Sequence, residues 1–486
     1  MQIVIVTDEP SLWPFEMPGV TVVDAWSYLT EAHYSTLRGV KIFNLCRSYH
    51  YQTAGYYVSL LAEARSHRPL PSVTTMQDIQ SPAMVRLLSG ELDDLIQKSL
   101  SPIHAKHFTV SIYFGRNTAK RYDRLSLHLF NLFQAPLLRA QFFRDGEGWQ
   151  LGSVRAIAVD EVPESHRAFL LQSAQEHFSG RRGTIRKKTN RFDLAILHDP
   201  SEAHPPSDET ALKRFAKAGE RAGFGVELIE RDDYARLAEF DALFIRETTH
   251  VNHHTYRFAR RAAQEGLVVI DDPQSIVRCT NKVYLAELMT RHKLPTPRTL
   301  VVNRDNRDVV AEELGYPCVL KQPDSAFSLG VVKAENEEEL NTQLDYFLSQ
   351  SELVVAQEFI SSTFDWRIGI LDQKPFYACK YHMAKKHWQI VRRDESGADH
   401  YGKSESLPVE TAPRKAVSLA KKAANLIGNG LYGVDVKQTG NGFYIIEVND
   451  NPNLDAGVED AILHEELYDR IMRVFLDRVE RKKAGL

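Results

Sequence analysis

Alternating hydrophobic and polar positions near the C-terminal end predict a β-hairpin. Two β-prone runs flank a glycine–asparagine turn signal at 440–442. With a three-residue loop, Asp435 would lie directly opposite Glu447, and Asn449 would share the face of Glu447 because side chains alternate along a strand. Three oxygen ligands at one strand end suit Mg²⁺, which completes its coordination with water and nucleotide phosphates. A polar strand end without a metal is the alternative, and the hairpin alone does not separate the two.

Residues 1–190 predict a separate α+β domain. Strands without steady strand–helix alternation indicate a sheet that helices cover on one side. Arg47, His50 and Tyr51 belong to a polar–aromatic cluster that could line a substrate pocket, and tyrosines packed in a core are the alternative. The expected extended segments are 2–6, 20–23, 40–45, 107–114, 125–133, 137–143 and 154–159, with a helix over about 52–65.

Strand and helix patterns alternate over residues 191–275, which predicts a small α/β domain with a mostly parallel sheet. Ser207 is the expected N-cap of its first helix. Arg246 ends one strand, and three histidines follow within 249–255. Histidines so close could hold a metal, but no fourth ligand is evident, and a polar helix start is the alternative.

The remaining residues, 276–486, contain a second candidate phosphate site. Lys321 lies on a predicted strand before the small-residue segment 324–330. An ammonium group next to loop amides suits nucleotide phosphates, and an ordinary surface lysine is the alternative. Further on, the basic run from Lys380 to His387 would attract an acidic substrate or would simply form a solvated face.

Composition limits the class of protein. The chain has 486 residues, of which 43% are hydrophobic and 26% charged, as in globular proteins of several domains. A net charge of −4 argues against a dedicated nucleic-acid binder. No apolar run approaches the ~18 residues that a membrane span needs. The four cysteines lack disulfide or zinc spacing, so we expect a cytoplasmic protein that binds neither membranes nor nucleic acids.

Taken in order, these segments resemble the ATP-grasp superfamily, and most closely the RimK-type glutamate ligases and their glutathione-synthase-like relatives. The resemblance covers the chain from about residue 193 to its end. It implies a multidomain α/β and α+β protein: an ATP-grasp fold over 276–486, a pre-ATP-grasp α/β domain over 191–275, and over 1–190 the α+β domain that precedes some RimK-like modules.

The resemblance also implies roles for individual residues, since each motif falls in the family's order. Asp435, Glu447 and Asn449 match the ligands of Mg²⁺ (or Mn²⁺). Arg367, Lys321 and Lys380 are the expected catalytic residues, and Arg246, Asn451 and Asn453 are expected to contact substrate. The residues expected to bind ATP are Lys282, Lys321, Ser325, Ser328, Gly330, Gln357, Glu358, Phe359, Ile360 and Asp365. Among them, Gln357 to Ile360 match the family's linker between lobes, which hydrogen-bonds adenine through its backbone.

The resemblance implies an ATP-dependent carboxylate–amine ligase. Such enzymes transfer the γ-phosphate of ATP to a carboxylate, and an amine then attacks the acyl phosphate, giving ADP and phosphate. The substrate would be an amino acid or a peptide, and a protein acceptor is also compatible. A homo-oligomeric assembly is compatible as well. One alternative is a nucleotide-binding regulatory or scaffold protein with a degenerate ATP-grasp site, and another is a kinase on the same fold. The sequence leaves open which two substrates are joined and whether one residue or a chain is added.

Overall fold

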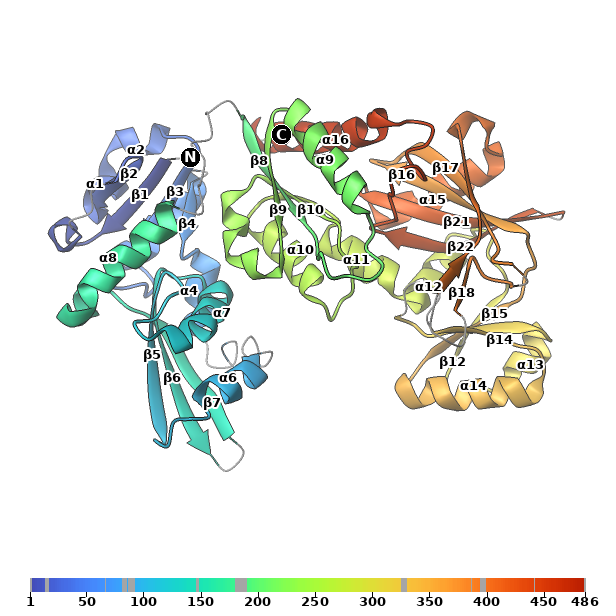
Figure 1. Ribbon diagram of the computed structural model, residues 1–486, viewed down its shortest axis with the longest axis horizontal. Helices are drawn as coiled ribbons and strands as arrows, with labels where there is room; N and C mark the ends of the chain where they lie inside the picture. The colour runs from blue at the N-terminus through green and yellow to red at the C-terminus, as the bar shows by residue number, and fades with distance from the viewer. Residues whose placement is uncertain are drawn as a thin grey trace. The chain divides into compact units, whose positions relative to one another are not determined.

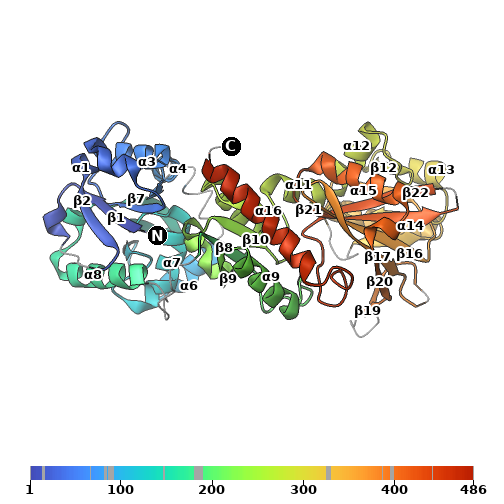
Figure 2. The same cartoon turned by 90° about the horizontal axis from the view of Figure 1, so that it is seen from above.

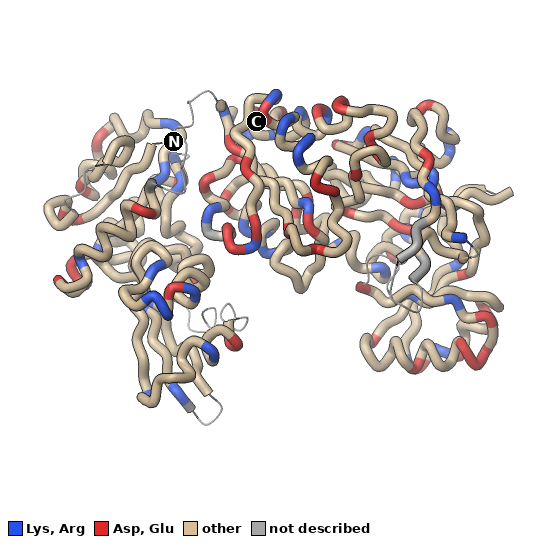
Figure 3. Tube along the Cα trace, viewed as in Figure 1, with Lys and Arg blue, Asp and Glu red and all other residues tan. Residues whose placement is uncertain are grey.

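The computed structural model describes residues 2–13, 17–65, 67–80, 85, 92–145, 148–179, 190–324, 330–385, 387–393, 399–440 and 442–484. They form two compact units, Met1–Lys188 and Thr189–Leu486. Acidic and basic residues are interspersed along both (Figure 3). Within the described ranges, no helix is long and apolar enough to cross a membrane. The expected division into three domains stays a prediction.

The first unit contains a parallel sheet with strand order β2-β1-β3-β4 (Figure 1). Tyr28 and Val58, from helices α1 and α3, lie in the apolar cluster on one face, and Phe43 packs against Phe178 of α8 on the other, with ring centroids 4.7 Å apart. The expectation of a sheet covered on one side is therefore wrong. The elements are β1 (Gln2–Thr7), β2 (Val20–Asp24), α1 (Ala25–Thr30), α2 (Ala32–Thr36), β3 (Val40–Asn44), α3 (Ala54–Ala64), β4 (Arg68–Leu70), α4 (Val73–Gln80) and α8 (Glu164–Ser179).

A three-stranded antiparallel sheet, β5-β6-β7, completes this unit. The segment 125–133, expected to be extended, is helical, because Leu125, Leu129 and Phe133 recur every four residues and are buried on one helix face. In the polar–aromatic cluster, the Tyr51 side chain is 67% exposed, so core packing does not explain it. The elements are α6 (Asp93–Leu100), β5 (His107–Tyr113), α7 (Asp123–Phe133), β6 (Leu137–Asp145) and β7 (Gly148–Ala156).

The second unit begins with the expected parallel sheet, of strand order β11-β10-β8-β9. One face packs on α10, while α9 and the C-terminal helix α16 cover the other through Phe215 and Phe475 (Figure 2). Asp208, and not Ser207, caps α9 by accepting a hydrogen bond from the Ala211 amide. The elements are β8 (Phe192–Leu197), α9 (Glu209–Arg221), β9 (Phe224–Ile229), β10 (Ala242–Ile245), α10 (His254–Gln264), β11 (Val268–Ile270), α11 (Pro273–Thr280) and α16 (Glu465–Ala484).

Two antiparallel sheets follow, of strand order β12-β15-β13-β14 and β20-β17-β16-β21-β22. Helices α13 and α14 pack on the first sheet, and α12 and α15 cover one face of the second. The elements are α12 (Lys282–Arg291), β12 (Thr299–Val302), α13 (Val309–Leu314), β13 (Cys318–Lys321), β14 (Val331–Ala334), α14 (Glu337–Gln350), β15 (Val354–Glu358), β16 (Phe364–Leu371), β17 (Lys374–His382), β18 (Val391–Arg393), β19 (Asp399–Tyr401), β20 (Ser404–Leu407), α15 (Arg414–Ile427), β21 (Leu431–Thr439) and β22 (Gly442–Asp450).

The C-terminal hairpin pairs Asp435 with Glu447, as the sequence predicts, but by a different route. Thr439 pairs with Gly442, so the expected three-residue loop is wrong, and the connection has two residues. A β-bulge follows, because Val436 pairs with Ile445 while Asp435 pairs with Glu447. The bulge adds the residue that the shorter loop removes and so restores the predicted pairing.

Gly369 in β16 provides a test of packing in the five-stranded sheet. A Cβ atom there would lie 2.1 Å from a ring carbon of Tyr377, whose side chain is buried and has no room to move. We expect Gly369→Ala to lower the free energy of unfolding by about 1–3 kcal/mol, measured by denaturant titration. A Cβ at Gly440 would meet nothing within 4 Å, so Gly440→Ala should stay within about 0.5 kcal/mol of the wild type. Equal stabilities for the two variants would contradict this packing.

Candidate functional site

One face of the five-stranded sheet carries five of the sequence-predicted site residues. Arg367 on β16 pairs with Asp435 on β21, which in turn pairs with Glu447 on β22. Asp365 and Asn449 are two residues from Arg367 and Glu447 on the same strands, so they point the same way. The opposite face is the apolar core against α15. The alternation of the strands therefore gathers these polar groups on the face that α15 leaves uncovered.

The two central carboxylates on this face are held by cations. Arg367 forms a bidentate ion pair with Asp435, with Nε at 2.5 Å from Oδ1 and Nη2 at 2.9 Å from Oδ2. Asn449 Nδ2 also donates to Asp435 Oδ2, at 3.2 Å. Lys282 Nζ lies 3.2 Å from Glu447 Oε1. Asp435, Glu447 and Asn449 thus form a compact set of oxygen donors, which is the chemistry that Mg²⁺ prefers.

Burial and neighbouring charges act against each other in this cluster. Burial lowers the pKa of Lys321 to about 8, although the charge of Glu447 opposes that change. Burial would raise the pKa of Glu447, but Lys282 and Lys321 outweigh it, and the net change is downward. Burial raises the pKa of Asp435, against the effect of Arg367. From the sequence, one would expect two repelling carboxylates here; in the structure, cations stand beside both of them.

A pocket with an empty volume of about 460 Å³ adjoins this face. Lys282, Lys321 and Glu447 form part of its polar wall, and Gln357 of the predicted adenine-binding segment also lines it. Apolar walls with a few convergent polar groups are typical of a ligand-binding site. The apolar wall comes from Leu285, Ala286, Met289, Val355, Ile445, Ile446 and Val448.

The predicted adenine-binding segment begins in β15 and leaves it at Glu358. Gln357 Nε2 donates to Thr299 Oγ1 at 2.9 Å, and the Glu358 carboxylate accepts from Arg298 Nε at 3.2 Å. Phe359 lies under Lys333 Nζ, 4.9 Å from the ring centroid. Ile360 follows outside the strand. Side chains of this segment are thus engaged with protein, and backbone contact with adenine stays a prediction.

The predicted phosphate segment is described only in part. Ser325 and Ser328 lie outside the described residues. Gly330 has a left-handed φ of 72°, and its carbonyl accepts a hydrogen bond from the Gln322 amide at 2.8 Å. This bond joins the two ends of the segment directly after Lys321.

Lys437 is a site residue that the sequence analysis missed. Its Nζ donates to Asp365 Oδ1 at 2.7 Å and to Ser362 Oγ at 2.8 Å. Lys437 is two residues from Asp435 on β21 and pairs with Asp365 across the ladder. The same alternation that aligned Glu447 with Asn449 could have indicated it. Lys437 adds one more cation to this face of the sheet.

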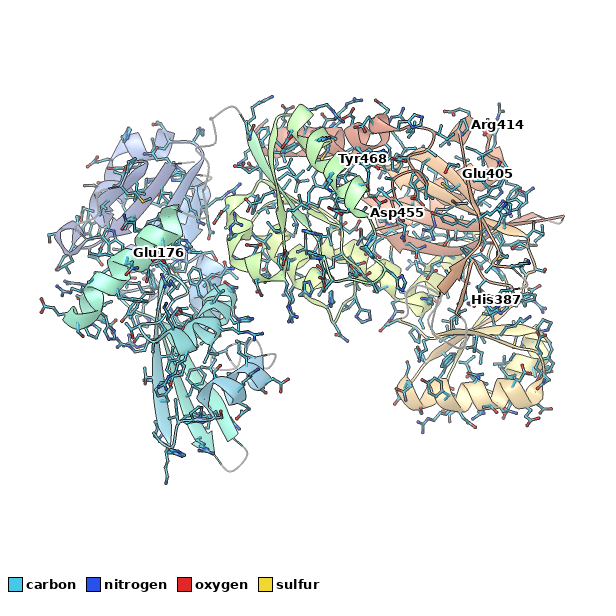
Figure 4. The ribbon with its side chains drawn as sticks, viewed as in Figure 1. Glu176, His387, Glu405, Arg414, Asp455 and Tyr468 are labelled. Atoms are coloured by element: carbon cyan, nitrogen blue, oxygen red, sulfur yellow. The ribbon has the colours of Figure 1, made fainter. Side chains whose placement is uncertain are left out.

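Lys380 does not join the site. It pairs with Trp366, whereas Arg367 pairs with the neighbouring Cys379, so Lys380 points to the opposite face of the sheet. Its Nζ lies 5.3 Å from the ring of Trp366 and 3.4 Å from the carboxylate of Glu405, which Figure 4 labels. The geometry thus separates Lys380 from Arg367 and gives it the buried Trp366 and the exposed Glu405 as partners.

The buried side chain of Arg246 links separate segments of the chain by hydrogen bonds. Its guanidinium is fully buried and donates to Asn451 Oδ1 at 2.6 Å, Ser207 Oγ at 3.0 Å and Pro452 O at 2.9 Å. These contacts join the end of β10 to the segment after β22. Asn451 accepts one of these hydrogen bonds from Arg246. Asn453 is half-buried. The substrate contacts expected of all three stay a prediction, and the packing of Arg246 and Asn451 favours a structural role.

Comparison with known proteins assigns two stretches of the chain to families. Residues 25–173 match the RimK-like ATPgrasp N-terminal domain, and residues 279–453 match an ATP-grasp domain. Together these matches span most of the first unit and the two antiparallel sheets.

Curated relatives match about half of this chain. The alpha-aminoadipate–LysW ligase LysX of Saccharolobus solfataricus is 27% identical over 255 residues, which is 49% of this chain and 88% of that protein. A probable alpha-L-glutamate ligase of Vibrio vulnificus is 27% identical over 267 residues, which is 51% of this chain and 85% of that protein. The solved structure of a RimK domain ATP-grasp protein of Sphaerobacter thermophilus aligns with 58% of this chain. The alignment covers 98% of that protein, at 16% identity and a TM-score of 0.44.

The buried Lys321 provides a test of the electrostatics of the site. Its pKa is about 8 in the folded chain, and an unfolded lysine has a pKa of about 10.4. Below about pH 8, folding therefore buries an ammonium group at a cost, and this cost disappears as the pH rises from about 8 to 10.4, where only the unfolded chain holds the proton. At pH 7, we expect the free energy of unfolding of Lys321→Met to exceed that of the wild type by up to about 3 kcal/mol. This difference should disappear as the pH rises from about 8 to 10.4.

Denaturant unfolding at several pH values measures this difference, with Lys374→Met as the control. Lys374 is exposed at the start of β17, so its replacement should change the free energy of unfolding by less than about 0.5 kcal/mol at each pH. A Lys321→Met variant that is less stable than the wild type at every pH would instead identify Lys321 as a stabilising partner of Glu447.

Proposed function

We propose that this chain, an ATP-grasp ligase with a RimK-like N-terminal domain, joins a carboxylate to an amine in a peptide-like amide bond. The observation that carries the proposal is the single sheet face on which Asp435, Glu447 and Asn449 stand beside Arg367 and two buried lysines. These are the groups that phosphoryl transfer needs, because its catalysis is mostly positioning and charge stabilisation.

Each group has a place in the binding of the nucleotide. The pocket between the two sheets would take the base, and Lys282 and Lys321 at its polar end would bind phosphate oxygens. Asp435, Glu447 and Asn449 would hold Mg²⁺, or Mn²⁺, which neutralises phosphate charge when bound. Arg367 stands on the same face and would stabilise the negative charge of the transferred phosphoryl group.

The reaction would then proceed in two steps. A carboxylate oxygen of the first substrate attacks the γ-phosphorus, and ADP leaves. The nitrogen of the second substrate attacks the resulting acyl phosphate, inorganic phosphate leaves, and the amine proton passes to solvent. The names of the relatives point to amino acids and peptides: one joins alpha-aminoadipate to LysW and another is an alpha-L-glutamate ligase. We infer an amino acid, peptide or protein acceptor here, in a cytoplasmic enzyme.

A regulatory or scaffold protein with a degenerate site is not favoured. Such a protein would have no need to keep a carboxylate charged at the proposed metal site. Glu447 is held in its charged form, since neighbouring lysines keep its pKa below the usual range. The curated relatives, which match about half of the chain, are also named as ligases.

We expect turnover to release ADP and inorganic phosphate, because the proposed carboxylate attacks the γ-phosphorus. The measurement is incubation of the full chain with ATP, Mg²⁺ and pooled amino acids, followed by nucleotide chromatography and mass spectrometry of condensation products. Release of AMP and pyrophosphate would contradict the acyl-phosphate route. A stable phosphoester without an amide product would identify a kinase.

Glu447→Gln tests the metal site directly. The change keeps the size of the side chain but removes a charge that a divalent cation and Lys282 both face. We expect kcat to fall about a hundredfold and the thermal stabilisation by Mg-ATP to weaken. The control is Glu405→Gln, since Glu405 is exposed and pairs with Lys380, on the face opposite Arg367. Normal turnover and unchanged magnesium dependence in Glu447→Gln would show that the hairpin is only a polar strand end.

A further inference from the structure

A second cluster of metal-ligating side chains lies outside the nucleotide site. Glu247 directly follows Arg246 at the end of β10, and His253 and His254 begin α10. The side chain of Glu247 is 3% exposed and that of His254 is 9% exposed. One carboxylate oxygen and one nitrogen of each imidazole all lie within 4.8 Å of one another. The sequence showed the histidines, but only the fold brings a carboxylate to them.

The hydrogen bonds of Thr255 determine which nitrogen of His253 carries its proton. The Thr255 hydroxyl donates to the Thr248 carbonyl at 3.3 Å, and Oγ1 lies 3.1 Å from His253 Nδ1. When this hydroxyl donates its single proton to Thr248, Oγ1 accepts from Nδ1–H of His253. The lone pair of His253 is therefore on Nε2, and Nε2 lies 4.0 Å from Glu247 Oε1.

This arrangement turns an acceptor of His253, whose side chain is 42% exposed, toward the buried carboxylate of Glu247. A lone pair of His253 and a carboxylate oxygen repel each other unless a cation or a proton lies between them. Within the described part of the chain, Glu247 Oε2 and His254 Nε2 are buried without a well-directed hydrogen bond, although His254 Nε2 is 2.5 Å from Glu247 Oε1. A simple Glu247–His254 hydrogen bond would satisfy neither Glu247 Oε2 nor His253 Nε2.

A further carboxylate increases the negative potential around the cluster. Both oxygens of Glu202 accept from the Thr248 amide, at 3.2 and 3.3 Å. A bound cation would relieve the repulsion between Glu202 and Glu247.

We propose that Glu247, His253 and His254 bind a first-row transition-metal ion of the Zn²⁺ type, at a site separate from the magnesium–nucleotide site. Two imidazole nitrogens and one carboxylate are a typical zinc ligand set, whereas Mg²⁺ prefers oxygen ligands. Three protein ligands leave a coordination position for water or for a substrate group. Thr255 fixes the orientation of His253 in the way that outer partners of metal-binding histidines do.

The site adjoins the nucleotide-binding hairpin through two hydrogen bonds. Asn451 Nδ2 donates to the Glu247 carbonyl at 2.6 Å, and Thr249 Oγ1 donates to Asp450 Oδ2 at 2.7 Å. A metal that orders Glu247 and the loop before α10 would therefore also stabilise the end of β22. The proposal does not depend on the ligase reaction, because the site is defined by residues that the reaction does not use.

Zinc binding to the full chain, without nucleotide, tests the proposal. We expect one equivalent of Zn²⁺ to remain after gel filtration, and competition with a fluorescent chelator to give its affinity. His253→Ala should weaken binding more than about a hundredfold, since loss of an outer partner alone weakens metal affinity about 10–100-fold. His292→Ala, which removes an exposed histidine after α12, should leave binding unchanged and so controls for adventitious surface sites.

Thr255 supplies a matched pair of variants with little risk of unfolding. Thr255→Ser keeps the hydroxyl that accepts from His253 and should bind zinc normally. Thr255→Val removes it and should weaken binding about 10–100-fold. Co²⁺ in place of Zn²⁺ should show visible d–d absorption in the wild type and in Thr255→Ser, and should lose it in His253→Ala. If no zinc is retained, or if His253→Ala binds it as the wild type does, the cluster is only a hydrogen-bonded glutamate–histidine pair and the proposal is wrong.

Discussion

The buried ion pair between Arg367 and Asp435 is the interaction on which the candidate nucleotide site depends. Its two members are directly opposite on β16 and β21, in the middle of the five-stranded sheet. A buried charge without a partner costs several kcal/mol, so this face tolerates charged groups only where their signs alternate. Lys282 beside Glu447 and Lys437 beside Asp365 repeat the same arrangement.

Alternating charges of this kind suit a site whose charged side chains exchange their ion-pair partners when a ligand binds. A nucleotide offers phosphates to the lysines, and a divalent cation offers charge to the carboxylates that those lysines release. Ligand binding would then replace one set of ion pairs by another and leave no buried charge uncompensated. Burial already lowers the pKa of Lys321, and it shares the carboxylate of Glu447 with Lys282.

A second constraint connects this face to the parallel sheet before it. Arg246 and Asn451 are 205 residues apart in the sequence and form a buried hydrogen bond. The C-terminal helix α16 reinforces the connection, because Phe475 packs against Phe244 of β10, with ring centroids 5.4 Å apart. The strand that carries Glu447 and Asn449 is thus anchored to β10, and so is Glu247 of the proposed zinc site. The same buried arginine positions both sites.

Patterns between near neighbours in the sequence were enough to predict much of this protein. Strand alternation aligned Asp435, Glu447 and Asn449, and the strand–helix alternation after residue 191 predicted the parallel sheet, because both patterns report local backbone geometry. The bulge that corrects the loop length was not visible, since it depends on pairing along the whole hairpin. The helix at 125–133 could have been predicted from its four-residue spacing of apolar side chains.

Tertiary structure alone decided which charged groups meet. The sequence could not show that Lys380 points away from Arg367, because the register of β17 against β16 sets that face. Nor could it show that Arg246 is satisfied by groups from the other end of the chain, or that Glu247 lies against His253 and His254. The physical reason is that a buried charge is stabilised by partners that folding brings together, and for Arg246 the partner Asn451 is 205 residues away in the sequence.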